Sequence, residues 1–249
     1  MKGTLAILRR ELLERLRSSA TGVLCVLAVG GLLALFFFIG FPIGDLRLAG
    51  FWSARVASLD VLFAWLPLFY ALLAPALTMG AWAEELRSGR VEMLFAQPVP
   101  LRSFVLGKFL AAWSLLVGIS LVAVLPLAFV VASIGPLDWG QVIGGLIGGA
   151  GLAAASTAIG LCASALGQEE LVSFLVSAFL LVGLWSTSLF VRVLPGGLAE
   201  VAWYASPSLH FLESGARGIF DARDLVYQGL LVAAGLLLNL VALEGRRYD

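Results

Sequence analysis

The stretch EELRSGRVEMLFAQPVPLRSFVLGK, residues 84–108, is a charged segment between two long runs without charged residues, 61–83 and 109–137. Four further charge-free runs lie at 18–44, 139–168, 171–191 and 225–243. Each run has the ~20 residues that an α-helix needs to cross the hydrocarbon core of a membrane. Backbone groups in lipid must find partners within their own segment, so the runs predict six transmembrane helices. We therefore expect an all-α integral membrane protein with a single transmembrane domain over 1–249.

The composition agrees with this class of protein. The chain is 61% hydrophobic and 13% charged, whereas soluble domains carry about 25% charged residues. Its formal net charge of zero gives no indication of nucleic-acid binding. Cys25 and Cys162 lie in separate apolar runs, which indicates small buried side chains rather than a disulfide framework or a metal site. The first run is too long, and its charged flank too helical, for a cleaved signal peptide.

The basic residues predict the orientation in the membrane. Six spans put both termini on one side, and all but five of the 16 Lys and Arg residues fall on the termini or on residues 84–108. The five on the other side are Arg47, Arg55, Arg192, Arg217 and Arg223. The positive-inside rule therefore places both termini and the 84–108 segment in the cytoplasm.

Residues 4–17, TLAILRRELLERLR, have the periodicity of an amphipathic helix. Leucines recur at three- and four-residue spacing, and the other side carries Arg9, Arg10, Glu14, Arg15 and Arg17. This pattern predicts a helix over 1–18 that lies in the membrane interface. The alternative is a solvated flank that only satisfies the charge rule.

Residues 84–98 also predict a short helix of mixed polarity. Gly89 weakens it slightly, and Pro98 ends it. Such a helix, projecting from two spans, suits a groove on a partner protein. A plain amphipathic connector at the membrane surface is the alternative.

Within the spans, prolines and glycines predict local features. Pro67 and Pro75 predict a kink or local unwinding in the second span. The pairs Gly144/Gly148 and Gly145/Gly149 permit close helix approach. Packing within one subunit explains them, and a subunit contact or translocation path is the alternative.

The segment 192–224 is not a plain loop. Residues 194–197, LPGG, break the fifth span, aromatic residues follow, and Ser206-Pro207 offers a helix start. We expect two short helices that enter the outer leaflet, with an ordinary external loop as the alternative. Asp221 can cap the last span. His210, the single histidine, is expected to be an ordinary polar surface residue.

Missing motifs exclude several classes of protein. There is no GxxxxGK[ST] phosphate loop, so this chain is not expected to hydrolyse ATP, and there is no HExxH zinc motif. The predicted spans contain no acidic, basic or histidine side chain, which argues against a proton relay. A membrane-embedded enzyme is disfavoured because no catalytic constellation is found. If the chain is a transporter, its energy must come from elsewhere.

Several stretches resemble ABC-2 type transporter permeases, most closely the branch associated with gliding motility and copper-enzyme maturation. Residues 84–94 resemble the family's EE…GT.E.LL signature, and Arg90 stands where a threonine is usual. Residues 97–99 and 105–108 resemble its P(V/L) and VLGK elements. Residues 154–164 are similar to its fourth span, and 210–224 to its HF…G(V/I).D.RD stretch.

This resemblance implies the permease subunit of an exporter in a bacterial cytoplasmic membrane. Its implied partners are a separate ATPase subunit, which holds ATP and Mg²⁺, a second permease subunit, identical or related, and membrane lipids. No cofactor is expected in this chain. The alternative is an ATPase-coupled membrane anchor or mechanotransmitter that acts on an external partner without moving solute.

The resemblance also implies two sets of site residues. The residues expected to couple to the ATPase are Glu84, Glu85, Arg87, Arg90, Glu92, Met93 and Leu94. The external gate segment is expected to use Trp203, Tyr204, His210, Phe211 and Asp221.

Overall fold

A computed structural model describes residues 2–41, 48–54, 56–95, 97–191, 195–219 and 221–246. These residues form helices and no strand, apart from one isolated bridge between Phe41 and Leu48. Six helices are long and apolar enough to cross a membrane, which confirms the predicted all-α, multi-pass class. They are Ser19–Ile39, Asp60–Arg87, Leu101–Ile134, Trp139–Leu166, Glu170–Ser188 and Ala222–Gly245.

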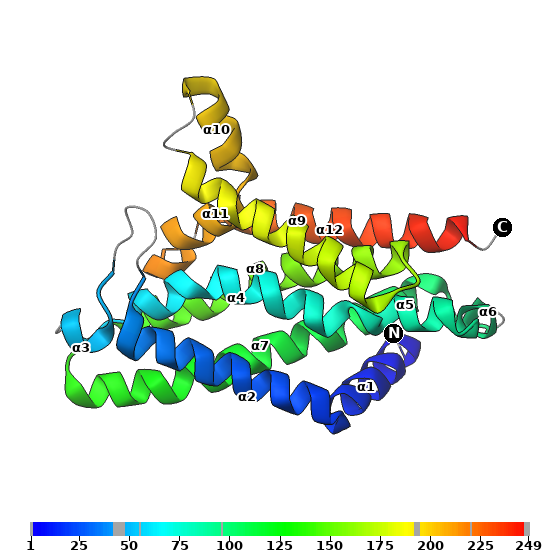
Figure 1. The fold of residues 1–249 in the computed structure, drawn as a ribbon, viewed down its shortest axis with the longest axis horizontal. Helices are drawn as coiled ribbons and strands as arrows, with labels where there is room; N and C mark the ends of the chain where they lie inside the picture. The colour runs from blue at the N-terminus through cyan, green and yellow to red at the C-terminus, as the bar shows by residue number, and fades with distance from the viewer. Residues whose placement is uncertain are drawn as a thin grey trace.

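The helices follow one another as labelled in Figure 1. The first half comprises α1 Lys2–Arg17, α2 Ser19–Ala34, the π-helical turn η1 Leu35–Ile39, α3 Phe51–Ala54, α4 Asp60–Thr78, α5 Gly80–Arg87 and α6 Arg90–Phe95. The second half comprises α7 Leu101–Ile134, α8 Trp139–Leu166, α9 Glu170–Phe190, α10 Gly196–Ala205, α11 Pro207–Glu213, the 3-10 turn η2 Gly215–Arg217 and α12 Ala222–Gly245.

Helix α7 begins earlier than the charge-free run predicts. It starts at Leu101, directly after Pro100, and continues for 34 residues. At 1.5 Å per residue it is about 51 Å long, well beyond the ~30 Å of a hydrocarbon core. The helix is therefore longer than a hydrocarbon core is thick, and its N-terminal part includes Lys108.

Helix α4 lies at the centre of the bundle. In the span Asp60–Arg87, 78% of the most apolar window is buried, against 17% in the spans that contain α2, α9 and α12. Polar side chains of α4 find partners inside the core, where the Tyr70 hydroxyl lies 2.7 Å from Ser120 Oγ. The three peripheral spans present apolar surface outward, as lipid-facing helices do.

The glycines of α8 allow neighbouring segments to touch its backbone. A Cβ added at Gly145 would lie 2.3 Å from the Phe63 ring, and one at Gly144 would lie 2.5 Å from Gly218 Cα. Gly148 faces Gly215 in the same way, with 3.0 Å between the added Cβ and Gly215 Cα. Close packing within one subunit, predicted from these glycines, is confirmed.

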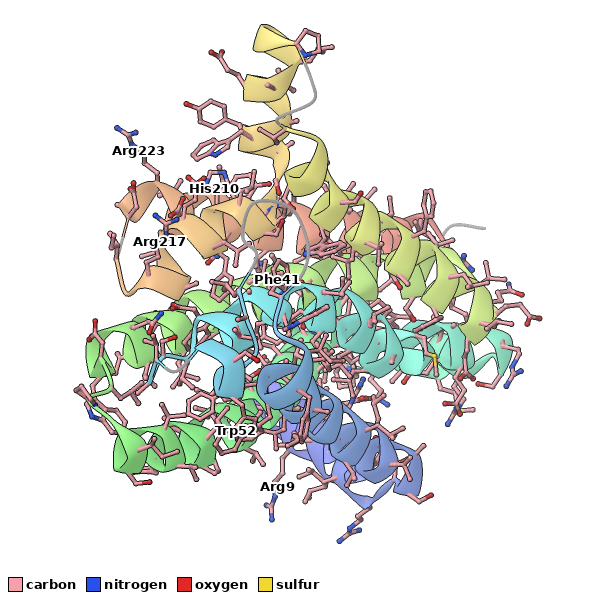
Figure 2. All side chains as sticks on the ribbon, turned by 60° about the vertical axis from the view of Figure 1, so that its left-hand side comes forward. Arg9, Phe41, Trp52, His210, Arg217 and Arg223 are labelled. Carbon is pink, nitrogen blue, oxygen red and sulfur yellow. The ribbon has the colours of Figure 1, made fainter. Side chains whose placement is uncertain are left out.

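The two ends of the bundle differ. Helix α1, the tip formed by α5 and α6, and both chain termini gather at one end, which we call the terminal end (Figure 1). Helix α3, the turn η2 and the start of α12 lie at the opposite end (Figure 1). Arg9 projects from the terminal end, whereas Arg217 and Arg223 lie at the opposite end (Figure 2). The predicted positions of Arg47, Arg55, Arg192 and Arg247 fall outside the described residues.

Candidate functional site

The second span is interrupted where α4 gives way to α5. Helix α4 ends at Thr78 and α5 begins at Gly80; Met79 between them keeps helical backbone angles, with φ of −53° and ψ of −45°, and the interruption lies in the hydrogen bonds that follow it. The kink or local unwinding predicted from Pro67 and Pro75 stays a prediction, because both prolines lie inside α4 and the interruption falls at Met79, one turn after Pro75. Backbone groups at such a break lose their helical partners and need others.

Side chains from two other helices supply those partners. Ser164 Oγ of α8 donates to the Met79 carbonyl at 2.7 Å and accepts from the Trp82 and Ala83 amides at 3.0 and 3.2 Å. The Arg15 guanidinium of α1 donates to the Leu77 carbonyl. The break is thus closed by α8 on one side and by α1 on the other.

Two glycines allow these helices to come so close. A Cβ added at Gly160 of α8 would lie 2.3 Å from Thr78 Oγ1, at the end of α4. A Cβ added at Gly107 of α7 would lie 2.6 Å from Ile7 Cγ2 of α1. Helix α1 is therefore packed against the first turns of α7 rather than separated from the bundle.

Beside the break lies a charge cluster, formed by Glu11, Arg15, Glu85 and Lys108, in which Lys108 is buried and the other three side chains are 13–16% exposed. Lys108 Nζ of α7 is 3.0 Å from Glu11 Oε1 of α1 and 2.8 Å from Glu85 Oε1 of α5. The Lys108 side chain is 3% exposed, and its ammonium lies 4.9 Å from the centre of the Trp82 ring. One lysine therefore joins three helices.

The charges of this cluster balance, because it holds two acids and two bases. Arg15 Nη2 lies 3.9 Å from Glu11 Oε2. Burial lowers the pKa of the Arg15 guanidinium, and the carboxylates of Glu11 and Glu14 oppose that effect. Among the described residues, the buried atoms Glu85 Oε2 and Arg15 Nε have no hydrogen-bond partner. Removing one member would leave an uncompensated buried charge, which costs about 3–5 kcal/mol in comparable pairs.

Lys108 lies outside the predicted charge-free run 109–137 but inside the helix Leu101–Ile134, where it is buried. One expectation is corrected by this cluster. Arg15 was expected on the outward polar side of the first helix, but it lies on the packed face with Ile7 and Glu11. The packed face of α1 thus carries charged groups that meet charged partners, so its apolar periodicity alone could not identify it.

The expected single helix over 84–98 is two helices. Gly89 adopts a left-handed conformation with φ of 70° and separates α5 from α6. Glycine reaches this region without steric cost, so it ends the helix here rather than weakening it. The Ser88 hydroxyl accepts from Arg90 Nε at 2.9 Å and donates to the Glu84 carbonyl at 2.7 Å, which holds the turn.

The tip places the predicted coupling residues on two different sides. Glu84, Arg87, Arg90 and Glu92 are exposed, as is Met93 at 68%. Arg90 pairs with Glu84, and Arg87 Nη2 is 3.8 Å from Glu170 Oε1 of α9. Leu94 packs inward against the cluster that contains Trp82 and Phe104. Glu85 also points inward, to Lys108, and is not part of the exposed surface.

At the opposite end, His210 is buried, so the expectation of a polar surface residue is wrong. It is 5% exposed, and its Nδ1 lies 2.6 Å from Asp224 Oδ1. Its ring stacks on Tyr227 at 4.4 Å between centroids and meets the Trp203 ring edge-on at 4.9 Å. Nε2 lies 3.3 Å from the Tyr204 carbonyl, so both ring nitrogens face oxygen acceptors. This contact joins α10, α11 and α12 (Figure 2).

The other residues of the expected gate segment have structural partners. Phe211 is fully buried and packs against Phe63 of α4, with 6.5 Å between the ring centroids. Asp221 caps α12 by accepting from the Arg223 amide at 2.9 Å, as predicted. The segment contains two short helices, but they differ: α11 is largely buried, whereas α10 has no buried residue. Part of the expected break at 194–197 lies outside the described residues.

Sequence reasoning did not predict the partners of several polar groups that the fold brings together. Ser164 carries no signal in the sequence, because a serine in a span usually bonds to its own helix. Gln228 and Asn239 of α12 are buried and donate to the Gly148 and Leu161 carbonyls of α8, at 3.5 and 2.8 Å. Within the described part of the chain, no group of three His, Cys, Asp or Glu side chains could hold a metal ion. Cys25 and Cys162 are unpaired thiols.

Comparison with known proteins adds no relative: no protein-family model matches the chain, and no curated protein matches it.

Proposed function

We propose that this chain is the permease subunit of an ATP-driven exporter of the ABC-2 type that it resembles. Two such subunits, identical or closely related, would pair with two separate ATPase subunits that hold ATP and Mg²⁺. The observation that carries the proposal is the connection of the tip to the bundle. Glu85 of α5 shares Lys108 of α7 with Glu11 of α1, directly beside the break in the second span.

The two breaks make α5 suited to transmit a push. It is a segment of eight residues that begins at the interrupted helical hydrogen bonds beside Met79 and ends at the turn formed by Gly89. A displacement of α5 would reach α7 and α1 through Lys108, and α8 through the hydrogen bonds of Ser164. Packed helices respond to such displacements by shifting between discrete arrangements.

The outer surface of the tip has the character of a docking site. Its exposed residues combine both charge signs with the apolar side chain of Met93. An exposed pair such as Arg90–Glu84 adds only about 0–1 kcal/mol to the stability of the fold. A contribution this small does not explain why the tip carries these charges. In this proposal the ATPase contacts the exposed residues Glu84, Arg87, Arg90, Glu92 and Met93. The inward-facing Glu85 and Leu94 pass the displacement of the tip on to the bundle.

The proposal places the terminal end in the cytoplasm of a bacterial cell and the bundle in its cytoplasmic membrane. The excess of Lys and Arg on the termini and the tip supports this orientation. In it, α1 lies at the inner membrane interface, and α10 dips into the outer leaflet. The exposed Leu198, Val201 and Tyr204 of α10 are apolar or aromatic, as residues of the membrane interface are.

Co-purification tests the proposal. Tagged protein is extracted from native membranes with a gentle detergent, and its partners are identified by mass spectrometry. We expect an ATPase with the wild type and none with the double reversal Arg87→Glu/Glu92→Arg. The reversal Arg217→Glu/Arg223→Glu at the opposite end is the control and should retain the ATPase. A folded wild-type chain recovered alone would contradict the proposal.

A second function, an ATPase-coupled membrane anchor or mechanotransmitter, is favoured by one observation. Helix α10 projects from the bundle and has no buried residue, which leaves a surface for an external partner (Figure 1). This function predicts that deleting residues 196–205 leaves ATP hydrolysis intact but abolishes crosslinking to an external protein. ATP-dependent solute uptake by sealed inverted vesicles would argue against it.

A further inference from the structure

Two hollows at the terminal end adjoin each other. A cleft of about 340 Å³ lies between α1, the start of α2 and the junction of α4 with α5. A shallower hollow of about 380 Å³ follows the outer face of α2 and is lined by Ser19, Ala20, Val23, Leu24 and Leu27. Ala20 lines both. The first hollow is polar and the second mostly apolar, so together they match an amphiphile.

The charges that line the cleft indicate which polar headgroup of an amphiphile can bind there. Its basic side chains are Arg10, Arg15, Arg90 and Lys108, and its acidic ones are Glu11, Glu14, Glu84, Glu85 and Glu170. A purely anionic headgroup would meet an excess of carboxylates, and a purely cationic one would meet four bases. A zwitterion with a phosphate and an amine can satisfy both signs.

The phosphate fits at the start of α2. Ser18, the residue before α2, makes no side-chain capping bond, so the first-turn amides of the helix are open. Ser18, Ala20 and Thr21 line the cleft, which brings this helix N-terminus to its wall. Helix N-termini bind phosphate through such amides. Arg15 lines the same wall, and its buried Nε has no partner among the described residues.

The amine fits among carboxylates that are not fully engaged. Among the described residues, the basic neighbour of Glu170 is Arg87, whose Nη2 lies 3.8 Å from Glu170 Oε1. The Glu170 carboxylate lies next to Gly80 in the cleft. Glu14 is more than half exposed; its Oε1 accepts from Arg10 Nε at 2.9 Å, which leaves Oε2 for the amine. None of the described residues that line the cleft is aromatic. Trimethylammonium groups are recognised by aromatic faces, whereas a primary amine donates hydrogen bonds to carboxylates.

We infer that the cleft and the apolar hollow bind one intact phospholipid with a primary-amine headgroup. Its phosphate lies at the N-terminus of α2, its amine contacts Glu14 and Glu170, and one acyl chain follows α2 past Ala20 to Leu27. The cleft volume is within the roughly 300–1,000 Å³ of small-molecule sites. The inference does not depend on the proposed exporter function, because neither the site nor its test involves ATP.

Native mass spectrometry of the delipidated full chain tests the inference. The chain is titrated with phosphatidylethanolamine, and with phosphatidylcholine and phosphatidylglycerol of the same acyl composition. We expect one phosphatidylethanolamine to bind at least about tenfold more tightly than the other two, the size of one charge-assisted hydrogen bond. Soluble phosphoethanolamine should bind much more weakly than the intact lipid. Equal affinity for all three lipids, or for the soluble headgroup, would overturn the inference.

Two pairs of variants separate the headgroup from the acyl chain. Glu14→Gln/Glu170→Gln should reduce phosphatidylethanolamine binding to the level of phosphatidylcholine, whereas Glu244→Gln, an exposed carboxylate at the same end, should not. Ala20→Trp fills the junction and should weaken all lipids, whereas Val26→Trp on the exposed face of α2 should not. Unchanged selectivity in the first pair, with the fold intact by circular dichroism, would refute the assignment of the amine.

Discussion

Lys108 of α7 pairs with Glu11 of α1 and Glu85 of α5, and so holds three helices together. Lys108→Met leaves Glu11 and Glu85 buried without their shared counter-ion. We expect the free energy of unfolding in detergent, measured by denaturant titration, to fall by about 3–5 kcal/mol. The double variant Lys108→Met/Glu85→Gln removes one base and one acid, keeps the Arg15–Glu11 pair and should regain most of this loss. A double variant as unstable as the single one would show that packing, not charge, accounts for the effect.

Ser164 has a comparable role at the break, through hydrogen bonds rather than charge. Ser164→Ala leaves the Trp82 and Ala83 amides and the Met79 carbonyl without this partner. We expect a loss of about 1–3 kcal/mol in the same unfolding measurement. Ser186→Ala is the control, because the Ser186 hydroxyl bonds to the Gly183 carbonyl of its own helix. Equal losses in the two variants would contradict a special role for Ser164.

At the scale of residues, the sequence predicted local roles, such as helix caps and close-contact glycines, better than it predicted which side chains meet. It placed Asp221 as a cap and the glycines of α8 as contact points, because these roles depend on local spacing. It could not predict that Lys108, at the edge of an apolar run, is buried, or that Glu85 points away from the tip. Both facts depend on α1 packing against α7, which brings Glu11 to Lys108 beside Glu85, a long-range contact without a periodic signature.

The turn between α5 and α6 depends on Gly89. Its φ of 70° is in the region that side chains disfavour, although a Cβ there would meet no other atom. Gly89→Ala should therefore cost about 1–2 kcal/mol through backbone strain alone. Faster hydrogen exchange of the amides of residues 84–95 would report this loss. Gly118→Ala, in an open helical position, should not destabilise the chain.

Helix α8 depends on close approach rather than on backbone conformation. Gly145→Ala places a methyl group 2.3 Å from the Phe63 ring. Such overpacking costs typically about 1–3 kcal/mol, so the midpoint of thermal unfolding in detergent should fall. Gly183→Ala, with no atom within 4 Å of the added Cβ, is the matched control on α9. An unchanged midpoint for Gly145→Ala would mean that α4 and α8 can separate freely.

At the scale of elements, the charge-free runs predicted six spans because a bilayer sets the length of each. The ends of those spans were harder to predict. Helix α7 begins at Leu101 because neither Arg102 nor Lys108 prevents a helix from continuing past the hydrocarbon. The charged segment divides at Gly89 because glycine at a helix end favours the left-handed conformation. Helix propensity alone predicts only a less stable helix at this position, not the end of one helix and the start of another.

At the scale of the whole molecule, the two ends should face opposite sides of the membrane. Single cysteines at Ser88 and Glu200, both exposed, can be placed in a Cys25→Ala/Cys162→Ala background. An impermeant maleimide should label Glu200→Cys from outside intact cells and Ser88→Cys only after the cells are opened. Labelling of both from the same side would contradict the orientation that the basic residues predict.

Transmission from the tip to the opposite end is tested most directly by a distance measurement. Spin labels at Ser133 of α7 and Glu200 of α10, both exposed at the opposite end, report on the bundle in the complex with the ATPase. We predict that ATP changes this distance in the otherwise wild-type chain. In Lys108→Met/Glu85→Gln, which keeps the Arg15–Glu11 pair, the ATPase should still bind and hydrolyse ATP, but the distance should stay constant. An equal change in this double variant would contradict transmission through the charge cluster.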